Sequence, residues 1–377
     1  MKKIGITGAS GFIGYHLSRA ISLNQDYYKL VPFKRDCFYD NDSMDEFVTN
    51  CDVIVHLAAL NRHENDEVIF QTNLELTDKL IEALLRTDSR PHVIYTSSVL
   101  EKDSSSLYGS SKKESRIKLF NWSKDVGSTF TGLLLPNIFG PFSKPFYNTV
   151  VATFSHQLIF NHNPMVKEDR TLGLLYVGDL VNHILKNIDF NSINSEVQIQ
   201  ATEKIKVSDI LLLLASFKKE YYSLGNIPNL CSKFELDLFN TFRSFIPLEE
   251  TYPRLLEIHK DNRGSFTELI RANSGGQTSF STTLPRVTRG EHFHTRKIER
   301  FMVIKGQAMV QMRKIGSEEI FSFILDGRTP SYVDIPIWYT HNISNIGDEE
   351  LITVFWINEP YNIENPDTWM EPVISKH

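Results

Sequence analysis

Cysteine is scarce in this sequence, and its three residues stand far apart. Cys37, Cys51 and Cys231 are odd in number and lack the close spacing of a metal site or a disulfide framework. This scarcity predicts reduced thiols and a cytoplasmic location. Glycines interrupt the first apolar stretch at once, at Gly5 and Gly8, which argues against a secretory signal.

The sequence also lacks a long apolar run and an excess of positive charge. No stretch of about 18 apolar residues occurs, so we expect no insertion into a membrane. The net charge of -6 argues against a nucleic-acid partner, which would favour a basic surface. A hydrophobic content of 41% and a charged content of 23% are typical of globular proteins, and 377 residues predict two domains.

A short apolar run at residues 4–7 leads directly into a glycine-spaced turn. Gly8, Gly11 and Gly14 stand at the first, fourth and seventh positions of this turn, and a segment with helical spacing follows. Glycines let the backbone turn tightly and approach a pyrophosphate, which the free N–H groups at a helix N-terminus attract. The pattern predicts a dinucleotide site. Its predicted contacts are Gly8, Ser10, Gly11, Phe12, Ile13 and Gly14.

The residues that follow the second predicted strand, 28–33, bear on the choice of cofactor. Lys34 and Arg35 come directly after this strand, where a dinucleotide fold meets the adenosine ribose. An acidic residue there favours NAD, whereas basic residues accommodate the 2′-phosphate of NADP. The pair therefore favours NADPH, although a solvated pair of loop residues explains it about as well.

Two more buried strands are predicted at residues 52–59 and 93–98. They end in small or hydroxyl-bearing residues, and open α/β sheets bind ligands at the carboxyl ends of their strands. Small residues there let a cofactor lie against the backbone. The predicted cofactor contacts from these strands and the helix between them are Leu57, Ala58, Ala59, Asn73 and Thr96.

Tyr108 and Lys112 stand four residues apart, so they share one face of a helix. A nearby ammonium group lowers the pKa of a phenol, which would let Tyr108 exchange a proton near neutral pH. This spacing alone is common on exposed helices. Its place after the glycine turn and the strand that ends in serines favours a catalytic pair.

In this order, the motifs resemble the extended short-chain dehydrogenase/reductase family, which includes nucleotide-sugar epimerases and dehydratases. The resemblance implies a Rossmann domain with a doubly wound parallel sheet. It implies that Ser98, or alternatively Ser97, polarises a carbonyl, that Tyr108 donates the proton, and that Lys112 holds the nicotinamide ribose. Pro136 and Asn137 would lie where nicotinamide and substrate meet. The short loop between Ser98 and Tyr108 lacks the second catalytic group of the dehydratases, which favours a reductase.

Imidazole and carboxylate groups gather in the last third of the sequence. His292 and His294 are two residues apart, so they would point the same way from one strand, and Glu299 would come from the next. Gly306 is predicted to close the following hairpin. Together with His341, the residues His292, His294 and Glu299 make the ligand set of a zinc or iron site.

Short alternating runs after residue 255 predict an all-β sandwich or barrel, and prolines place the domain border near residue 246. The two domains would be 1–245 and 246–377. The spacing of the histidines and Glu299 resembles the cupins, which implies a jelly-roll barrel. Residues 261–268 resemble the opening of the deoxysugar-nucleotide 3,5-epimerases. In those relatives a histidine placed like His292 is the catalytic base, so His292 is either a ligand or a base.

The whole arrangement resembles bifunctional enzymes of capsular polysaccharide synthesis. That resemblance implies epimerisation at C-3 of a UDP-4-keto-6-deoxy-N-acetylhexosamine by the cupin. NADPH-dependent reduction at C-4 would then give UDP-2-acetamido-2,6-dideoxy-β-L-talose. It further implies a cupin zinc and a homodimer. The alternatives are another 4-keto deoxysugar nucleotide as substrate, or an NADP-sensing cupin regulator. The presence of both Tyr108 and Lys112 counts against a sensor.

Overall fold

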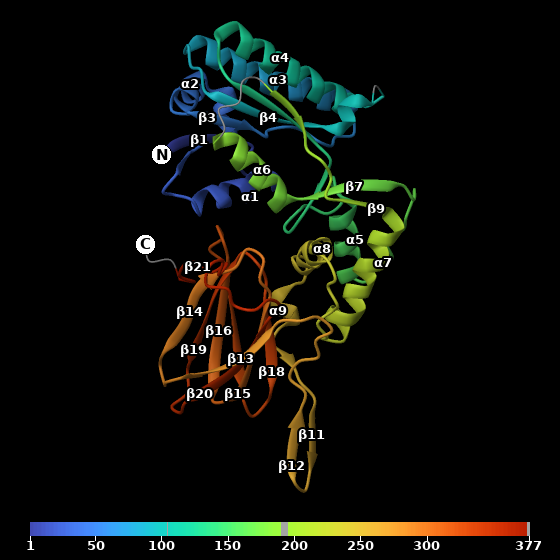
Figure 1. Ribbon diagram of the computed structural model, residues 1–377, viewed down its shortest axis with the longest axis vertical. Coiled ribbons are helices and arrows are strands. Elements are labelled where there is room, and N and C mark those ends of the chain that lie inside the picture. The colour runs from blue at the N-terminus through green and yellow to red at the C-terminus, as the bar shows by residue number, and fades with distance from the viewer. Residues whose placement is uncertain (104, 190–194, 375–377) are drawn as a thin grey trace. The chain divides into compact units, whose positions relative to one another are not determined.

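The chain divides into two compact units. The computed structural model describes residues 1–103, 105–189 and 195–374. The first unit comprises Met1–Phe154 and Met165–Ile210, and the second comprises Ser155–Pro164 and Leu211–His377 (Figure 1). The expected border near residue 246 separates two sequence patterns and stays a prediction.

A six-stranded parallel sheet forms the centre of the first unit. Its order is β2-β1-β3-β4-β5-β8, so the chain reverses its direction of winding between β1 and β3. Sheets of this kind bind ligands at such a reversal. The strands are β1 (Lys2–Thr7), β2 (Tyr28–Val31), β3 (Val53–His56), β4 (His92–Ser98), β5 (Phe130–Leu135) and β8 (Ser195–Gln198).

Helices cover both faces of this sheet, which confirms the predicted doubly wound α/β fold (Figure 1). Val53 and Val55 of β3 pack in one apolar core and Ile54 packs in the other, since alternate residues of a strand face opposite sides. The first core includes residues of α1 (Phe12–Ser22) and α6 (Val177–Asp189). The second includes residues of α2 (Asn41–Thr49), α3 (Asp66–Arg86) and α4 (Leu107–Val126).

Smaller elements belong to the first unit or to the segments in which the chain passes from one unit to the other. A three-stranded sheet has the order β6-β7-β9. The helix α7 continues as a π-helical turn, η3. The elements are η1 (Arg35–Tyr39), η2 (Val99–Lys102), β6 (Asn137–Phe139), α5 (Val150–Ile159), β7 (Thr171–Tyr176), β9 (Glu203–Lys206), α7 (Val207–Phe217) and η3 (Lys218–Ser223).

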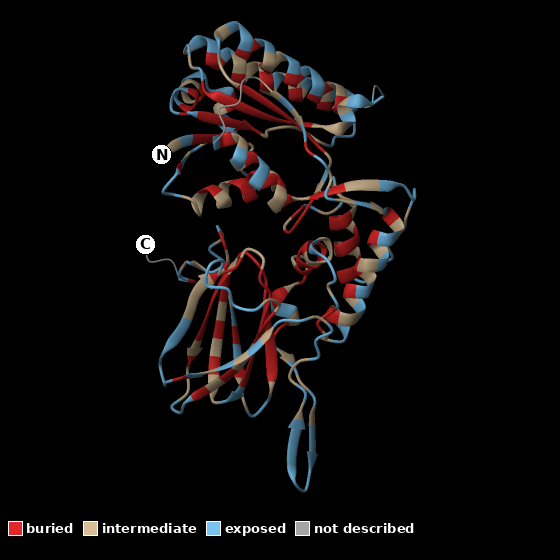
Figure 2. Cartoon of the chain, in the orientation of Figure 1, coloured by how far each residue is buried: buried red, intermediate tan, exposed pale blue. Residues whose placement is uncertain are grey.

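Two five-stranded antiparallel sheets dominate the second unit, which confirms the predicted all-β, cupin-like region. Their orders are β10-β18-β15-β20-β13 and β17-β16-β19-β14-β21. Two short helices precede them, and a two-stranded hairpin, β11-β12, is largely exposed (Figure 2). The elements are α8 (Lys233–Arg243), α9 (Leu248–Thr251), β10 (Arg254–Leu255), β11 (Ile258–Asp261), β12 (Gly264–Thr267), β13 (Gln277–Thr283), β14 (Thr288–Phe293), β15 (Glu299–Lys305), β16 (Gln307–Lys314), β17 (Ile320–Asp326), β18 (Ser331–Ile335), β19 (Tyr339–Asn345), β20 (Leu351–Ile357) and β21 (Trp369–Met370).

The prediction that Gly306 closes a hairpin was wrong. Gly306 has a φ of 83° and does turn the chain between β15 and β16. However, these strands belong to different sheets, β15 pairing with β18 and β20, and β16 with β17 and β19. A turn residue marks where a strand ends, whereas its pairing depends on distant parts of the chain.

No helix among the described residues combines the length and the apolar character needed to cross a membrane.

Candidate functional site

The glycine turn between β1 and α1 has the geometry that a pyrophosphate site requires. Gly8 has a φ of 78°, and a Cβ there would lie 2.9 Å from the amide nitrogen of Ala58. A Cβ at Gly14 would lie 2.3 Å from the Gly8 carbonyl oxygen, so helix and turn pack too closely for any side chain. No side chain hydrogen-bonds as a cap at Gly11, the N-cap of α1, and Ser10 and Gly11 are exposed. The first amides of α1 are therefore available to an anion.

The remaining predicted cofactor and catalytic residues of the first unit follow the carboxyl ends of neighbouring strands or begin the helix after them. Leu57, Ala58 and Ala59 follow β3, Thr96 and Ser98 end β4, Pro136 and Asn137 follow β5, and Tyr108 and Lys112 lie in the first turns of α4. Phe12 and Ile13 begin α1, beside the glycine turn. Lys34 and Arg35 are exposed beyond β2, and their predicted contact with a 2′-phosphate stays a prediction.

Asn73 is buried on α3, and its amide is already engaged within the protein. Its Oδ1 accepts the Leu60 amide at 2.7 Å, while its Nδ2 donates to the Leu60 carbonyl at 3.1 Å and to the Ser111 hydroxyl at 3.0 Å. Asn73 therefore fixes the loop after β3 against α4. Its direct contact with a cofactor stays a prediction.

The two candidate serines differ in their hydrogen bonds. Ser97 is buried, and its hydroxyl donates to the Glu101 carboxylate at 2.7 Å. The Ser98 hydroxyl accepts a hydrogen bond from the Leu100 amide at 3.2 Å, and its own proton has no acceptor among the described residues. The geometry thus favours Ser98 as the serine that can donate to a substrate carbonyl.

Glu101 lies in the loop expected to lack a second catalytic acid, and its carboxylate is occupied. The Arg116 guanidinium donates two hydrogen bonds to it, at 2.9 and 3.1 Å, in addition to the bond from Ser97. Both side chains are less than a tenth exposed, and Arg116 also pairs with Glu196. This network holds the turn after β4 against α4. Sequence reasoning missed it because Arg116 stands 15 residues from Glu101.

The predicted lowering of the Tyr108 pKa was wrong in direction. Burial raises the pKa of the Tyr108 phenol to about 12, and repulsion from Tyr147 adds to the effect. The spacing of Tyr108 and Lys112 predicted that they share one face of a helix, but it did not predict how deeply each side chain is buried. The phenol is therefore protonated at neutral pH, which is the form that donates a proton.

Lys112 is almost completely buried on α4. Its ammonium lies 4.2 Å from the centre of the Tyr95 ring, a contact that favours the charged form. Burial nevertheless dominates and lowers the pKa of Lys112 to about 7. The side chain therefore changes charge within the physiological range.

Replacing Lys112 with methionine is expected to stabilise the first unit at pH 7, by an amount that shrinks as pH rises. The folded pKa is about 7, against about 10.4 for an unfolded lysine. Between these values the unfolded state binds more protons, so wild-type stability rises with pH by up to about 1.4 kcal/mol per unit. Urea unfolding, followed by the helical circular dichroism at pH 7, 8 and 9, measures the difference in unfolding free energy between the variant and the wild type. The exposed neighbour Lys113, changed to methionine, is the control. If this difference did not depend on pH, the burial of a titrating amine at position 112 would be contradicted.

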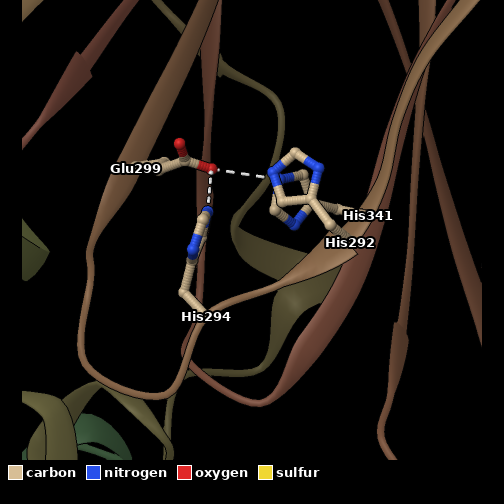
Figure 3. Close-up of side chains that lie close together, drawn as sticks. All are labelled: His292, His294, Glu299 and His341. Atoms are coloured by element: carbon tan, nitrogen blue, oxygen red, sulfur yellow. Dashed lines mark ion pairs between the residues drawn. The ribbon is translucent and has the colours of Figure 1, made fainter. Parts of the chain in front are cut away.

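Four metal-ligand side chains meet in the second unit, three from residues 292–299 and one, His341, from 42 residues further along the sequence. His292 lies in β14, His294 directly follows that strand, Glu299 begins β15 and His341 lies in β19. Their candidate ligand atoms lie within 4.8 Å of one another. The Glu299 carboxylate oxygen is 3.1 Å from His294 Nε2 and 3.0 Å from His341 Nε2 (Figure 3). The predicted ligand set therefore comes together.

A β-bulge sets the direction of His292. In the pairing of β14 with β19, Gly290 lies opposite Asn342 and His292 lies opposite His341, so Glu291 is an extra residue. Glu291 has a φ of 61°, and its carboxylate accepts the Asn342 side-chain amide at 2.8 Å. Bulges re-aim the side chains that follow them, and here the next one joins the cluster.

Each histidine in the cluster has one ring nitrogen bound to the main chain. His341 Nδ1 bonds the Tyr339 carbonyl at 3.2 Å, His294 Nδ1 bonds the Asp367 carbonyl, and His292 bonds the main chain of Gly290. In histidines that bind metals, such bonds fix the tautomer and orient the other nitrogen toward the ion. His294 Nε2 and His341 Nε2 are buried, have no hydrogen-bond partner among the described residues, and lie 3.1 and 3.0 Å from a Glu299 carboxylate oxygen.

The electrostatics of the cluster suit a cation. Burial, with repulsion from His341 and His294, lowers the pKa of His292 to about 4. Burial alone would raise the pKa of Glu299, but the adjacent rings of His294 and His341, whose Nε2 atoms lie 3.1 and 3.0 Å away, lower it well below its usual range. At neutral pH the cluster therefore holds a carboxylate and a neutral imidazole, as metal binding requires. In a tetrahedral zinc site, ligand atoms lie roughly 3.4 Å apart, close to the separations from Glu299. The residues fit zinc.

The sequence of the first unit matches a known enzyme family. Residues 4–199 match the NAD dependent epimerase/dehydratase family. The chain belongs to this family. Residues 259–369 match the polysaccharide biosynthesis C-terminal domain. Both motif sets found in the sequence therefore lie inside matched regions.

Two relatives match nearly the whole chain. One is the UDP-2-acetamido-2,6-beta-L-arabino-hexul-4-ose reductase of Pseudomonas aeruginosa, 32% identical over 97% of this chain and 98% of that protein. The other is a crystal structure of the capsular polysaccharide assembling protein CapF from Staphylococcus aureus. It matches with a TM-score of 0.62 and 31% identity, and covers 98% of this chain and 100% of that chain. The chain is thus CapF-like over its whole length, a nucleotide-sugar modifying enzyme of polysaccharide synthesis, as its motifs predicted.

A more distant structure shares the fold of the first unit. RMD from Pseudomonas aeruginosa, complexed with NADPH, matches at 19% identity with a TM-score of 0.53, over 58% of this chain and 83% of that chain. At this identity the match concerns the fold alone. The matched family itself is NAD-dependent.

Proposed function

We propose that this chain is a bifunctional, NADPH-dependent enzyme of capsule or O-antigen synthesis. Its cupin would epimerise C-3 of a UDP-4-keto-6-deoxy-N-acetylhexosamine, and its first unit would reduce C-4 to give UDP-2-acetamido-2,6-dideoxy-β-L-talose, on the route to UDP-N-acetyl-L-fucosamine. The observation that carries the proposal is the four-residue cluster around Glu299 on the same chain as a reductase site. The name of the Pseudomonas aeruginosa relative supports the substrate class. We further propose a cytoplasmic homodimer.

In the first unit, the proposed reduction needs a proton donor and a hydrogen bond at the ketone oxygen. When bound, NADPH supplies the hydride for C-4. The protonated Tyr108 phenol would donate its proton to O-4, so that ketone and hydride together become an alcohol. Ser98 would donate a hydrogen bond to the same oxygen, and Lys112 would hold the nicotinamide ribose.

In the second unit, the proposed epimerisation removes the C-3 proton next to the 4-ketone and returns it on the other face. Zinc, when bound, supplies positive charge that stabilises the enolate. His294, Glu299 and His341 would hold it, because their ligand atoms are buried and converge. His292 is the least buried of the three imidazoles and is neutral at pH 7, so it would be either the fourth ligand or the base at C-3.

The proposed function is tested by mixing the protein with NADPH and a UDP-4-keto-6-deoxy-N-acetylhexosamine and following the nicotinamide absorbance. We expect oxidation of NADPH, faster than of NADH, and one equivalent of zinc per chain in the purified protein. If a different 4-keto deoxysugar nucleotide were the preferred substrate, the proposed reaction would stand and the proposed substrate would be wrong. If no such ketone were reduced, the enzyme would have to be replaced by the NADP-sensing alternative.

The serine that polarises the ketone is tested by two matched variants. Ser98→Ala is expected to lower kcat for reduction by roughly 100- to 1,000-fold, the range for losing one hydrogen-bond donor to a developing oxyanion. Ser97→Ala is expected to act mainly on stability, because the Ser97 hydroxyl bonds Glu101. Steady-state kinetics and thermal unfolding of both variants separate these effects. The reverse pattern would assign the role to Ser97.

A further inference from the structure

The carboxylate of Asp367 lies against the loop that links two of the proposed metal ligands, His294 and Glu299. It is nearly fully buried, and it accepts hydrogen bonds from four donors in the loop between His294 and Glu299. The donors are the amides of Thr295, Arg296 and Lys297, at 2.9 to 3.2 Å, and the Thr295 hydroxyl at 2.7 Å. A single carboxylate thus accepts hydrogen bonds from three consecutive amides.

The main chain of the same residue contacts a proposed ligand directly. The Asp367 carbonyl oxygen accepts the Nδ1 proton of His294, although 73 residues separate them in the sequence. Because Nδ1 carries that proton, the lone pair of Nε2 faces Glu299, which is 3.1 Å away. Asp367 has a φ of 43°, an uncommon value for a residue other than glycine. The hydrogen bonds on both sides of this residue hold the backbone in that conformation.

The segment around Asp367 is fastened to the loop at further points. Lys297 Nζ donates to the Pro366 carbonyl at 2.6 Å. The Arg296 guanidinium donates to the Asn365 carbonyl at 2.9 Å and to the Glu359 carboxylate at 2.8 Å. Residues 359–367 therefore form a strap across the loop that carries His294 toward Glu299.

We propose that Asp367 is a positioning residue for the metal centre, which it serves through this strap. Its carboxylate fixes the loop and its carbonyl fixes the His294 tautomer, so that His294 and Glu299 meet the ion with little rearrangement. The inference rests on the proposed zinc site. It concerns zinc affinity rather than the chemistry at C-3, and it is tested without substrate.

The test replaces Asp367 with asparagine in the full chain. One carboxylate oxygen becomes an NH₂ group that faces backbone amides, so the loop loses acceptors and gains a repulsive donor. We expect zinc affinity to fall by about 10- to 100-fold, as for other groups that orient metal ligands. Competition with a chromophoric chelator measures this affinity. The visible spectrum of the cobalt-substituted protein should also change, because it reports ligand geometry.

Two further variants make the result decisive. Asp348→Asn removes an exposed ion pair with Arg286 and should leave zinc affinity unchanged. Thr295→Val removes one of the four donors at constant side-chain shape, and it should weaken zinc binding several-fold even if the asparagine variant fails to fold. Tryptophan fluorescence and NADPH binding monitor folding of the two units.

The possible outcomes separate the two proposals. A wild-type chain that binds no zinc removes the metal from the proposed function and this inference with it. A wild-type chain that binds zinc, with both the asparagine and the valine variant binding it equally well, overturns the inference and leaves the proposed function in place. Weaker binding in those variants, with the Asp348 control unchanged, supports it.

Discussion

Replacing Tyr108 with phenylalanine should nearly abolish NADPH oxidation while leaving proton exchange at C-3 intact. The change removes the hydroxyl that would protonate O-4, and general acid catalysis contributes roughly 10²- to 10⁴-fold. Burial keeps that phenol protonated at neutral pH, so no other protonation state of Tyr108 competes for the role. Deuterium uptake from heavy water at C-3, read by mass spectrometry, follows the second unit alone. An exposed tyrosine, Tyr27, changed to phenylalanine is the matched control.

The reciprocal variant, His292→Ala, should stop deuterium exchange at C-3. Reduction of a substrate that is already epimerised should continue, because Tyr108, Lys112 and the glycine turn are untouched. The zinc content of this variant distinguishes the two proposed jobs of His292. Retained zinc with lost exchange would identify a base, whereas lost zinc would identify a ligand. If either variant abolished both activities with the correct substrates, the proposed division of labour would be wrong.

Local patterns were sufficient to predict most of the first unit. The glycine turn, the buried strands and the pair of Tyr108 and Lys112 all depend on residues close in sequence, and parallel sheets with intervening helices follow from such units. Properties that depend on distant packing were not accessible. The pKa of Tyr108 moved in the opposite direction to the prediction, because burial outweighs any effect of Lys112. The ion pair of Glu101 with Arg116 was missed because it, too, depends on packing between separate elements.

In the second unit, the identity of the four clustered residues could be predicted, but not what holds them. The spacing of the first three residues, together with the resemblance to the cupins, predicted that His292, His294, Glu299 and His341 come together. These residues are held by a bulge at Glu291 and by Asp367. The hydrophobic pattern of the sequence predicts neither feature. The pairing of β15 and β16 with different sheets was likewise invisible, because a turn at Gly306 is compatible with either arrangement.

A buried ionic network joins helical and sheet parts within the second unit. Asp334 of β18 accepts two hydrogen bonds from Arg300 of β15, at 2.6 and 2.8 Å, and one from the Tyr221 hydroxyl at 2.6 Å. Arg243 of α8 donates to the same hydroxyl at 3.0 Å and to the Ile335 carbonyl at 2.9 Å. All four side chains are buried. The single carboxylate therefore balances two guanidinium groups that lack access to water.

Replacing Asp334 with alanine should consequently cost about 3–5 kcal/mol of unfolding free energy, the range for removing one partner of a buried ion pair. The loss comes less from the attraction than from leaving Arg300 and Arg243 buried without an anion. Three of the four tryptophans, at positions 338, 356 and 369, belong to the second unit. Urea unfolding followed by tryptophan fluorescence therefore reports mainly on that unit.

The matched control, Asp348→Ala, removes a pair whose carboxylate side chain is 93% exposed. Such pairs contribute about 0–1 kcal/mol, so the two aspartates should differ by several-fold although both pair with arginine. Arg300 bonds Asp334 and directly follows Glu299, so Asp334→Ala should also weaken zinc binding by loosening β15. A loss below about 1 kcal/mol for Asp334→Ala would mean that water reaches Arg300 and Arg243 after the substitution. The sheet and the helices before it would then be held together by apolar contacts rather than by this network.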